Sequence, residues 1–176
     1  MDKYLDDDET ARFEALAMPH LDAAYNLARW LTRNEHDADD LVQNAYLRAF
    51  RFAGGFRGGD ARAWLLTIVR HTYYTALRDG QAERGDVSFD ESLHDQENGG
   101  DPADIIASHD ASRTLNAALA RLPTAFREVL VLKEMDELSY KQIAEVTDAP
   151  IGTVMSRLAR ARQMLLSYLK PDVAGE

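Results

Sequence analysis

The chain contains no cysteine, which excludes disulfides, thiolate zinc sites and cysteine-based redox sensing. No apolar run approaches the ~20 residues needed to span a bilayer. The N-terminus, MDKYLDDDET, is acidic where a secretory signal would be basic and then apolar. The sequence therefore predicts a cytoplasmic protein that does not insert into a membrane. Its 176 residues suffice for one ordinary domain or for two small ones.

The usual signs of an enzyme are also missing. The five histidines are scattered, with no metal-ligand pair at helical spacing, and no glycine-rich phosphate loop follows a strand. No strand pattern is apparent, whereas apolar residues recur at helical spacings along much of the chain. We therefore expect an all-α protein that is not an enzyme and that holds no metal ion and no cofactor.

The acidic net charge of −10 argues against nucleic acid, but the charge is unevenly distributed. Net charges are −6 for residues 1–50, +3 for 51–80, −8 for 81–110, −1 for 111–150 and +2 for 151–176. The two positive segments are where we expect DNA to bind. The acidity elsewhere predicts weak non-specific affinity for DNA, and a protein partner that holds the chain on its target.

A helix, a tight turn and a second helix are predicted between residues 138 and 169. Ser139 with Gln142 forms a capping-box pattern at the start of the first helix. Pro150 is disfavoured inside a helix but suits a first turn, so it separates the two helices. The buried stripe of the second helix consists of Val154, Leu158, Ala161 and Leu165. Small polar and arginine residues early in the second helix suit a DNA-binding helix-turn-helix, but any helical hairpin in a bundle needs the same turn and stripe, so the pattern alone leaves both interpretations open.

The residues of this segment also resemble those of a known protein family. LSYKQIAE and GTVMSRLARAR resemble region 4 of the sigma-70 family, specifically of its small extracytoplasmic-function (ECF) type. The resemblance implies that the second helix reads the minus-35 promoter element in double-stranded DNA through Thr153, Met155, Ser156, Arg157 and Arg160. Met155 departs from the family, which often has lysine or arginine there. An apolar side chain can touch a thymine methyl group but cannot donate to guanine.

A second block of the chain resembles region 2.2 of the same family. DADDLVQNAYLRAFRF predicts a helix capped by Asp37 with Asp40, and its buried stripe ends at Phe52. A charged helical face is usually only solvated, but the resemblance implies docking on the clamp helices of the largest RNA polymerase subunit. The residues implied are Asp39, Asp40, Leu41, Gln43, Asn44 and Arg48. The family often has glutamate at the position of Asp39. It usually has an acidic residue at the position of Asn44.

The helix predicted over residues 61–78, with Asp60 as its cap, interleaves arginines with aromatic side chains. Such a mixture suits single-stranded DNA, because bases stack on flat side chains while guanidinium groups hold phosphates. We assign Trp64 mainly to packing and expect at least one of Tyr73 and Tyr74 to be exposed. The segment resembles regions 2.3 and 2.4, which recognise and melt the minus-10 element. The resemblance implies single-stranded DNA contacts by Arg57, Arg62, Trp64, Arg70, His71, Tyr73, Tyr74 and Arg78.

Residues 79–110 are acidic, rich in glycine and without helical periodicity, which predicts a flexible linker. We therefore expect two small helical domains, region 2 over residues 1–78 and region 4 over residues 111–170, followed by a tail over 171–176. The linker is either a passive tether or, as the resemblance implies, a segment that threads the polymerase channel later used by RNA.

The resemblance thus predicts a bacterial sigma factor. It would direct core polymerase, bound through the clamp helices and the flap, to specific promoters. It also implies a stress response and an anti-sigma partner. One alternative is a sigma-like decoy that titrates an anti-sigma factor, which would fit the departures at His71, Thr75 and Met155. The other is a simple helix-turn-helix regulator, which would not account for residues 37–78.

Overall fold

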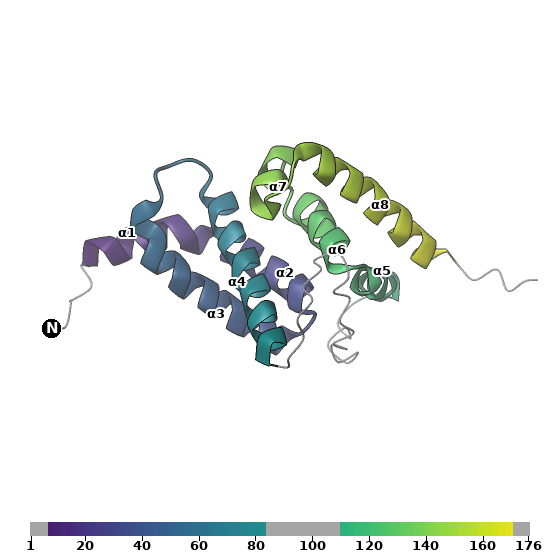
Figure 1. Cartoon of the computed structure of the whole chain (residues 1–176), viewed down its shortest axis with the longest axis horizontal. Coiled ribbons are helices and arrows are strands. Elements are labelled where there is room, and N and C mark those ends of the chain that lie inside the picture. Colours follow the sequence, from purple (N-terminus) through teal and green to yellow (C-terminus); the bar gives the residue numbers. More distant parts are fainter. Residues whose placement is uncertain (1–6, 84–109, 171–176) are drawn as a thin grey trace, which may run out of the picture.

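The computed structural model describes residues 7–83 and 110–170, which form two helical domains packed against each other (Figure 1). No strand occurs in these two ranges. The N-terminal domain contains α1 (Asp7–Ala17), η1 (Met18–His20), α2 (Leu21–Thr32), α3 (Glu35–Phe52), η2 (Ala53–Gly55) and α4 (Ala61–Glu83). The C-terminal domain contains α5 (Asp110–Arg121), α6 (Thr124–Leu130), η4 (Val131–Met135), α7 (Tyr140–Thr147) and α8 (Ile151–Leu169).

The N-terminal domain is built on three helices, α2, α3 and α4, which all pack against one another. Leu27 and Leu31 of α2, Ala45 of α3, and Leu65 and Val69 of α4 are buried between them. Burial of this apolar surface supplies most of the driving force for folding the domain. It also fixes which sides of α3 and α4 remain available to a partner.

The helix caps of this domain differ in part from the prediction. The cap of α3 is Asn34, whose side chain accepts a hydrogen bond from the backbone N–H of Asp37 at 3.0 Å. The predicted cap by Asp37 with Asp40 is wrong because Asn34, with an extended backbone, already satisfies this orphan N–H. The predicted cap of α4 is confirmed, since Asp60 Oδ1 accepts from the N–H of Ala63 at 3.1 Å.

The C-terminal domain contains the predicted helix-turn-helix. The Ser139–Gln142 capping box is present in both directions, at 3.1 and 2.8 Å. Asp148, in the left-handed conformation with φ 50°, ends α7, and Pro150 is the N-cap of α8. The predicted burial of the stripe is confirmed at three of its four positions, and the fourth residue is only partly buried. Val154, Leu158 and Ala161 are buried, whereas Leu165 is half-buried.

A π-helical turn, η4, connects α6 to the helix-turn-helix. The N–H of Asp136 donates to the carbonyl of Val131 five residues earlier, at 3.1 Å. Glu137 then adopts a positive φ of 56° and reverses the chain. Such π turns insert an extra residue into a helix and occur often at functional sites. Here the turn places Asp136 against α2 of the other domain, because Asn26 Nδ2 donates to Asp136 Oδ1 at 3.2 Å.

The predicted linker lies mostly outside the described residues, as does the predicted tail over residues 171–176. Helix α4 continues to Glu83, so residues 79–83 are helical where the sequence predicted the start of the linker. Across the described ranges, every helix is too short or too polar to cross a bilayer.

Candidate functional site

One face of α3 carries the residues predicted to dock on polymerase. Asp39, Asp40, Gln43 and Asn44 are exposed and Arg48 is half-buried. Leu41 is only 6% exposed and packs in the core, so it supports this face from beneath and does not form part of it.

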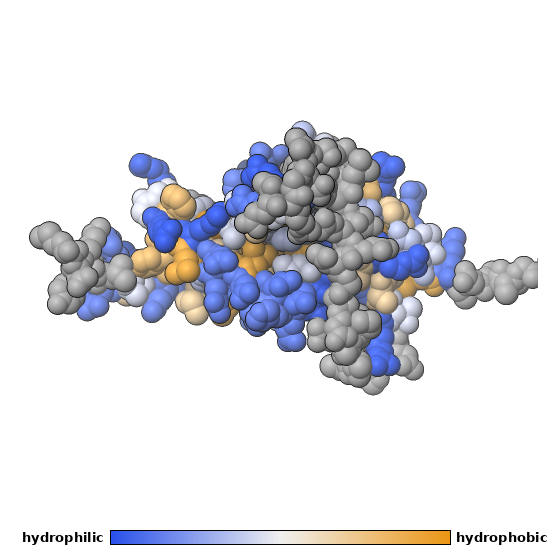
Figure 2. All heavy atoms as spheres, turned by 60° about the horizontal axis from the view of Figure 1, so that its bottom comes forward, coloured by the Kyte–Doolittle hydropathy of each residue, from blue (hydrophilic) through white to orange (hydrophobic). Residues whose placement is uncertain are grey.

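Two apolar side chains of α3 are exposed, which the sequence reasoning missed. Leu47 and Phe52 are 61% and 65% exposed, although Phe52 was predicted to be buried. Phe52 is the last residue of α3, where the chain leaves the helix and enters η2. Leu47 follows Asp40 by seven residues and therefore lies on its helical face, so the spacing could have identified it. In the view of Figure 2, apolar residues form small patches separated by polar ones.

The loop between α3 and α4 forms a cavity of about 630 Å³ together with α7. Phe56 and Trp64 line it with ring centroids 5.1 Å apart, and Arg57 lies at the same wall. Gly58 and Gly59 have φ values of 89° and 98°, a backbone conformation that favours glycine. The loop can therefore approach a ligand closely, but α7 of the C-terminal domain closes the cavity on the other side through Lys141, Gln142 and Glu145.

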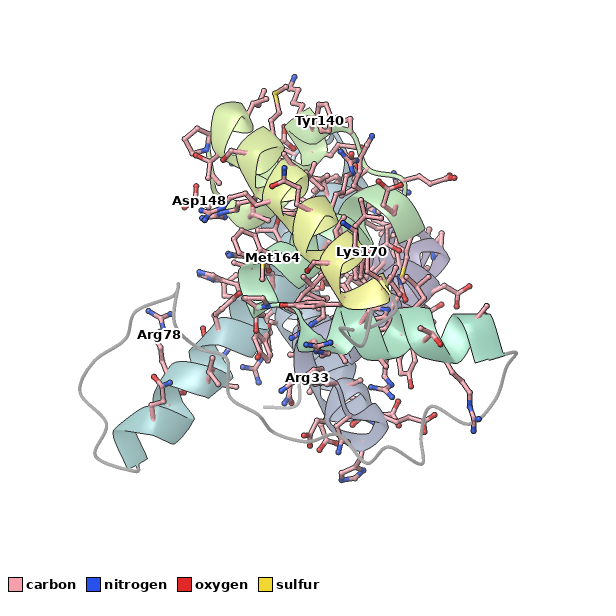
Figure 3. All side chains as sticks on the ribbon, turned by 90° about the vertical axis from the view of Figure 1, so that its right-hand side faces the viewer. Arg33, Arg78, Tyr140, Asp148, Met164 and Lys170 are labelled. Carbon is pink, nitrogen blue, oxygen red and sulfur yellow. The ribbon has the colours of Figure 1, made fainter. Side chains whose placement is uncertain are left out.

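The residues predicted to bind the minus-10 element differ in exposure along α4 and its loop. Arg57, His71 and Arg78 are exposed, Arg62, Trp64, Arg70 and Tyr73 are partly buried, and Tyr74 is buried. Figure 3 shows Arg78 on the end of α4 that extends away from the other helices. Helix α7 packs against α4, and Arg70 in the middle of α4 is paired with Glu128 of α6.

The prediction that Tyr73 or Tyr74 is exposed is wrong. Tyr74 is 8% exposed and Tyr73 is partly buried, with the two rings edge-to-face at 5.1 Å. Burial raises the pKa of the Tyr73 hydroxyl, which hydrogen-bonds to Thr124 of the C-terminal domain. The prediction treated the N-terminal domain as isolated, whereas the second domain packs on this side of α4.

A buried ion pair joins the domains at Arg70. Its Nε and Nη2 atoms donate to the two carboxylate oxygens of Glu128 at 3.0 and 3.1 Å. The Glu128 side chain has no exposed surface and that of Arg70 is 13% exposed. The Arg70 guanidinium also lies 4.6 Å from the ring centroid of Tyr74. A residue predicted to bind DNA is thus engaged by a carboxylate of the same chain.

A second buried arginine, Arg127, joins three helices. Its guanidinium donates to the carbonyl oxygens of Trp30 at 2.7 Å, Ala120 at 3.2 Å and Leu122 at 2.7 Å, and to Thr124 Oγ1 at 3.3 Å. Arg33, labelled in Figure 3, donates from the other domain to the same Ala120 carbonyl at 2.8 Å. Sequence reasoning missed Arg127 and Glu128, because two charged residues in a helical pattern indicate a solvated face.

A polar cluster at the rim of the domain contact centres on Asp136. Arg62 Nη1 donates to the Asp136 carbonyl at 3.0 Å, so a second predicted minus-10 residue is engaged by the C-terminal domain. Burial raises the pKa of the Asp136 carboxyl to about 6, and the hydrogen bond from Asn26 offsets only part of this effect. Nearby, Gln142 donates to Asp60, the cap of α4.

The raised pKa of Asp136 makes the folded state sensitive to pH. Because burial favours the neutral carboxyl, its ionisation destabilises the folded protein increasingly between the unfolded pKa of 3.8 and the folded pKa of about 6, and fully above that. We expect Asp136→Asn to raise the melting temperature by roughly 2 to 4 °C at about pH 7.5. The gain should disappear near about pH 3.5. Calorimetric scans of both proteins across this range test it, and a gain that does not depend on pH would contradict it.

Of the residues predicted for minus-35 recognition, Ser156 and Arg160 lie opposite the buried stripe of α8, and Thr153, Met155 and Arg157 lie on its flanks. Met155, Ser156 and Arg160 are exposed, and Thr153 and Arg157 are half-buried. Met155 is 51% exposed at the start of the helix, and Arg160 lies 5.8 Å from the ring centroid of Phe126. None of these five side chains is buried, so a groove of DNA can reach this face, whereas Arg70 of α4 is engaged by Glu128.

This geometry defines a two-domain helical DNA-binding protein with a helix-turn-helix in its second domain and a basic, aromatic helix in its first. Comparison with known families then gives two matches. Residues 16–83 match Sigma-70 region 2, and residues 112–165 match Sigma-70, region 4. The ECF RNA polymerase sigma-E factor of Haemophilus influenzae is 33% identical over 158 residues, which cover 82% of this chain and 80% of the relative. The chain belongs to the sigma-70 family, among its ECF sigma factors.

Other relatives and solved structures agree. The ECF RNA polymerase sigma factor SigE of Mycolicibacterium smegmatis is 34% identical over 161 residues, and the match covers 89% of this chain but 61% of that protein. The sigma factor RpoE in complex with the anti-sigma factor NepR, from Bartonella quintana, superposes with a TM-score of 0.71 at 28% identity, over 92% of this chain and 98% of that one. CnrH in complex with the cytosolic domain of CnrY gives a TM-score of 0.64 at 25% identity, over 93% and 90%. The predicted family and the all-α fold are confirmed.

Proposed function

We propose that this protein joins core RNA polymerase in the cytoplasm, reads the minus-35 element through the exposed face of α8, and holds the melted minus-10 strand on α4 and its preceding loop. The observation that supports the proposal is that α8, α4 with its preceding loop, and α3 each present exposed residues of the predicted DNA-binding and polymerase-docking sets. A simple helix-turn-helix regulator would not require the α3 face or the aromatic loop. The protein acts as an initiation subunit and performs no catalysis of its own.

The minus-10 surface suits a single strand. The Phe56 and Trp64 rings border an open cavity beside Arg57, and base stacking on aromatic rings contributes about 1–3 kcal/mol per base. His71 is exposed on α4 and can donate to a base or to a phosphate. We expect His71 and Thr75 to change which minus-10 bases are preferred without abolishing binding of the DNA strand.

The minus-35 surface is expected to divide its roles between affinity and specificity. Arg157 and Arg160 supply positive charge along α8, which serves phosphates, while Met155 projects at the start of the helix, where base edges are read. Replacing an arginine that binds phosphate weakens all promoters alike, whereas replacing a residue that reads a base relaxes preference at one position.

An anti-sigma factor is proposed as a further partner. Of the two solved structures, RpoE is bound to the anti-sigma factor NepR, and CnrH is bound to the cytosolic domain of CnrY. In this chain, Leu166 on α8 and Ile151 at its start are 61% and 47% exposed, which leaves apolar contact area on the C-terminal domain. Such a partner would link this protein to a stress signal.

The test is run-off transcription with purified core polymerase, for which we expect specific transcripts that depend on this protein. Arg160→Ala should reduce transcription from all its promoters roughly 10-fold, as the loss of a phosphate contact predicts. Met155→Ala should change the preference at one minus-35 position and leave other promoters unchanged. Binding to core without any open complex would instead support the decoy, which has a sigma-like fold but does not initiate.

A further inference from the structure

The methionines of this chain differ in exposure and in what surrounds them. Among the residues that the structure describes, Met155 is 51% exposed, Met18 48% and Met135 40%. Met164, labelled in Figure 3, is only half-exposed and packs against the core. Of these four, Met155 alone belongs to the residues proposed to read the minus-35 element. Its chemistry therefore bears directly on promoter recognition.

Met155 lies on an open flank of α8. Ile151 lies one helical turn before it and Ala159 one turn after it, and both are exposed. Ser156, the next residue, lies opposite the buried stripe of the helix and is also exposed. The Met155 thioether is thus accessible both to a DNA groove and to small solutes.

A thioether is the group of this chain that peroxide oxidises most readily. The sequence has no cysteine, so no thiolate within the chain competes for the oxidant. Hydrogen peroxide converts methionine to its sulfoxide: a sulfur lone pair takes up one peroxide oxygen, the O–O bond breaks, and the other oxygen leaves as water with both peroxide hydrogens. The sulfur loses two electrons, and these reduce the peroxide. Methionine sulfoxide reductases reverse the reaction, so the modification can act as a switch.

Oxidation changes what the side chain of Met155 can contact in the major groove. The thioether is apolar and can pack on the methyl group of thymine. The sulfoxide is polar, and its oxygen is a hydrogen-bond acceptor. Amino donors are presented in this groove by adenine N6 and cytosine N4. The oxidised side chain therefore loses the apolar contact and gains a preference for these donors.

We propose that Met155 is an oxidation site through which peroxide changes the promoter preference of this protein. The thioether form favours thymine at one minus-35 position, and the sulfoxide form favours adenine or cytosine there. This inference rests on the proposed function, and it adds a regulation of the same surface. It gives a chain without cysteine a direct response to oxidant.

The site itself is tested by chemistry alone. Purified protein is treated with hydrogen peroxide, the oxidant is removed with catalase, and the oxidised residues are mapped by mass spectrometry of peptides. We expect Met155 to be oxidised about 5-fold or more faster than the half-buried Met164, because oxidation follows exposure of the sulfur. Equal rates at the two positions would overturn the assignment of the site.

The effect on promoters is tested by run-off transcription. Oxidised protein, freed of peroxide, is combined with untreated core polymerase, so that only the sigma subunit carries the modification. The templates carry each of the four bases in turn at each minus-35 position. At one position we expect oxidation to lower transcription from thymine templates about 5-fold, and to leave adenine or cytosine templates within about 2-fold. Treatment with a methionine sulfoxide reductase should restore the original preference.

Three variants assign the effect to one sulfur atom. Met155→Leu keeps an apolar side chain without sulfur, so peroxide should not change its base preference. Met18→Leu and Met135→Leu remove exposed sulfurs outside the minus-35 face and should keep the wild-type response to peroxide. A shift in preference that Met155→Leu shares with wild type, or oxidation of Met155 without any shift, would overturn the proposal. Failure of the untreated protein to transcribe from any template would instead contradict the proposed function, and the inference with it.

Discussion

Arg127→Ala is expected to cause the largest loss of stability among single substitutions in this protein, about 3 kcal/mol or more. Arg127 is 2% exposed and serves four acceptors, three of which are backbone carbonyls. Without its guanidinium the Trp30 and Leu122 carbonyls lose their donor inside the fold, whereas Ala120 keeps its bond from Arg33, and each buried group left unpaired costs about 1–3 kcal/mol. The free energy of unfolding from urea titrations measures the effect.

Arg127→Met separates the effect of hydrogen bonding from that of packing, and Arg12→Ala is the control for loss of an arginine. Arg127→Met fills much of the same volume but donates nothing, so it should lose nearly as much stability as Arg127→Ala. Arg12→Ala removes an exposed arginine whose ion pair with Asp8, at 2.7 Å, lies on the surface of α1, and it should stay within about 0.5 kcal/mol of wild type. If Arg127→Met were as stable as wild type, the hydrogen bonds would not be the cause.

Leu47→Asp is expected to weaken binding to core polymerase by about 10-fold or more, since an anchoring side chain at an interface contributes about 2 kcal/mol or more. Leu47 is 61% exposed on the predicted docking face and packs little within the chain itself, so its replacement should leave the melting temperature unchanged. Phe52→Asp, at the end of the same helix, is expected to have a similar effect. Equilibrium titration of labelled protein with purified core measures the affinity.

The matched control for this experiment is Leu115→Asp on α5. Leu115 is also an exposed leucine on a helix, at 39%, but it lies on the C-terminal domain, away from α3 (Figure 1). It should retain wild-type affinity for core. Equal losses for both leucine variants would mean that added charge, not the α3 face, reduces binding.

The parts of the fold that the sequence predicted correctly depend on residues close together in the chain. The Ser139–Gln142 capping box and the Asp60 cap each join groups three residues apart, so their geometry follows from the helix itself. The buried stripe of α8 repeats at helical spacing for the same reason. Even the wrong cap of α3 was a choice among neighbours, because Asn34 and Asp37 are both residue types that cap helices and lie three positions apart.

The parts that it could not predict depend on groups far apart in the chain. Arg70 and Glu128 are 58 positions apart, and Arg127 and Trp30 are 97. Charged residues give no local signal of burial, because they are buried only when a specific partner is supplied. The burial of Tyr73 was missed for the same reason, since its hydroxyl bonds to Thr124 of the second domain.

The sequence by itself thus determined the helices, the caps at Asp60 and Ser139, the helix-turn-helix and the family, because periodicity and short motifs act over one or two helical turns. Only the tertiary structure decided which predicted DNA-binding residues are accessible. Arg62 and Arg70 are bound by acceptors of the C-terminal domain, whereas Met155 and Arg160 are exposed. The physical reason is that accessibility depends on how the two helical domains pack, and the polar groups that join them are far apart in the chain and become partners only in the folded protein.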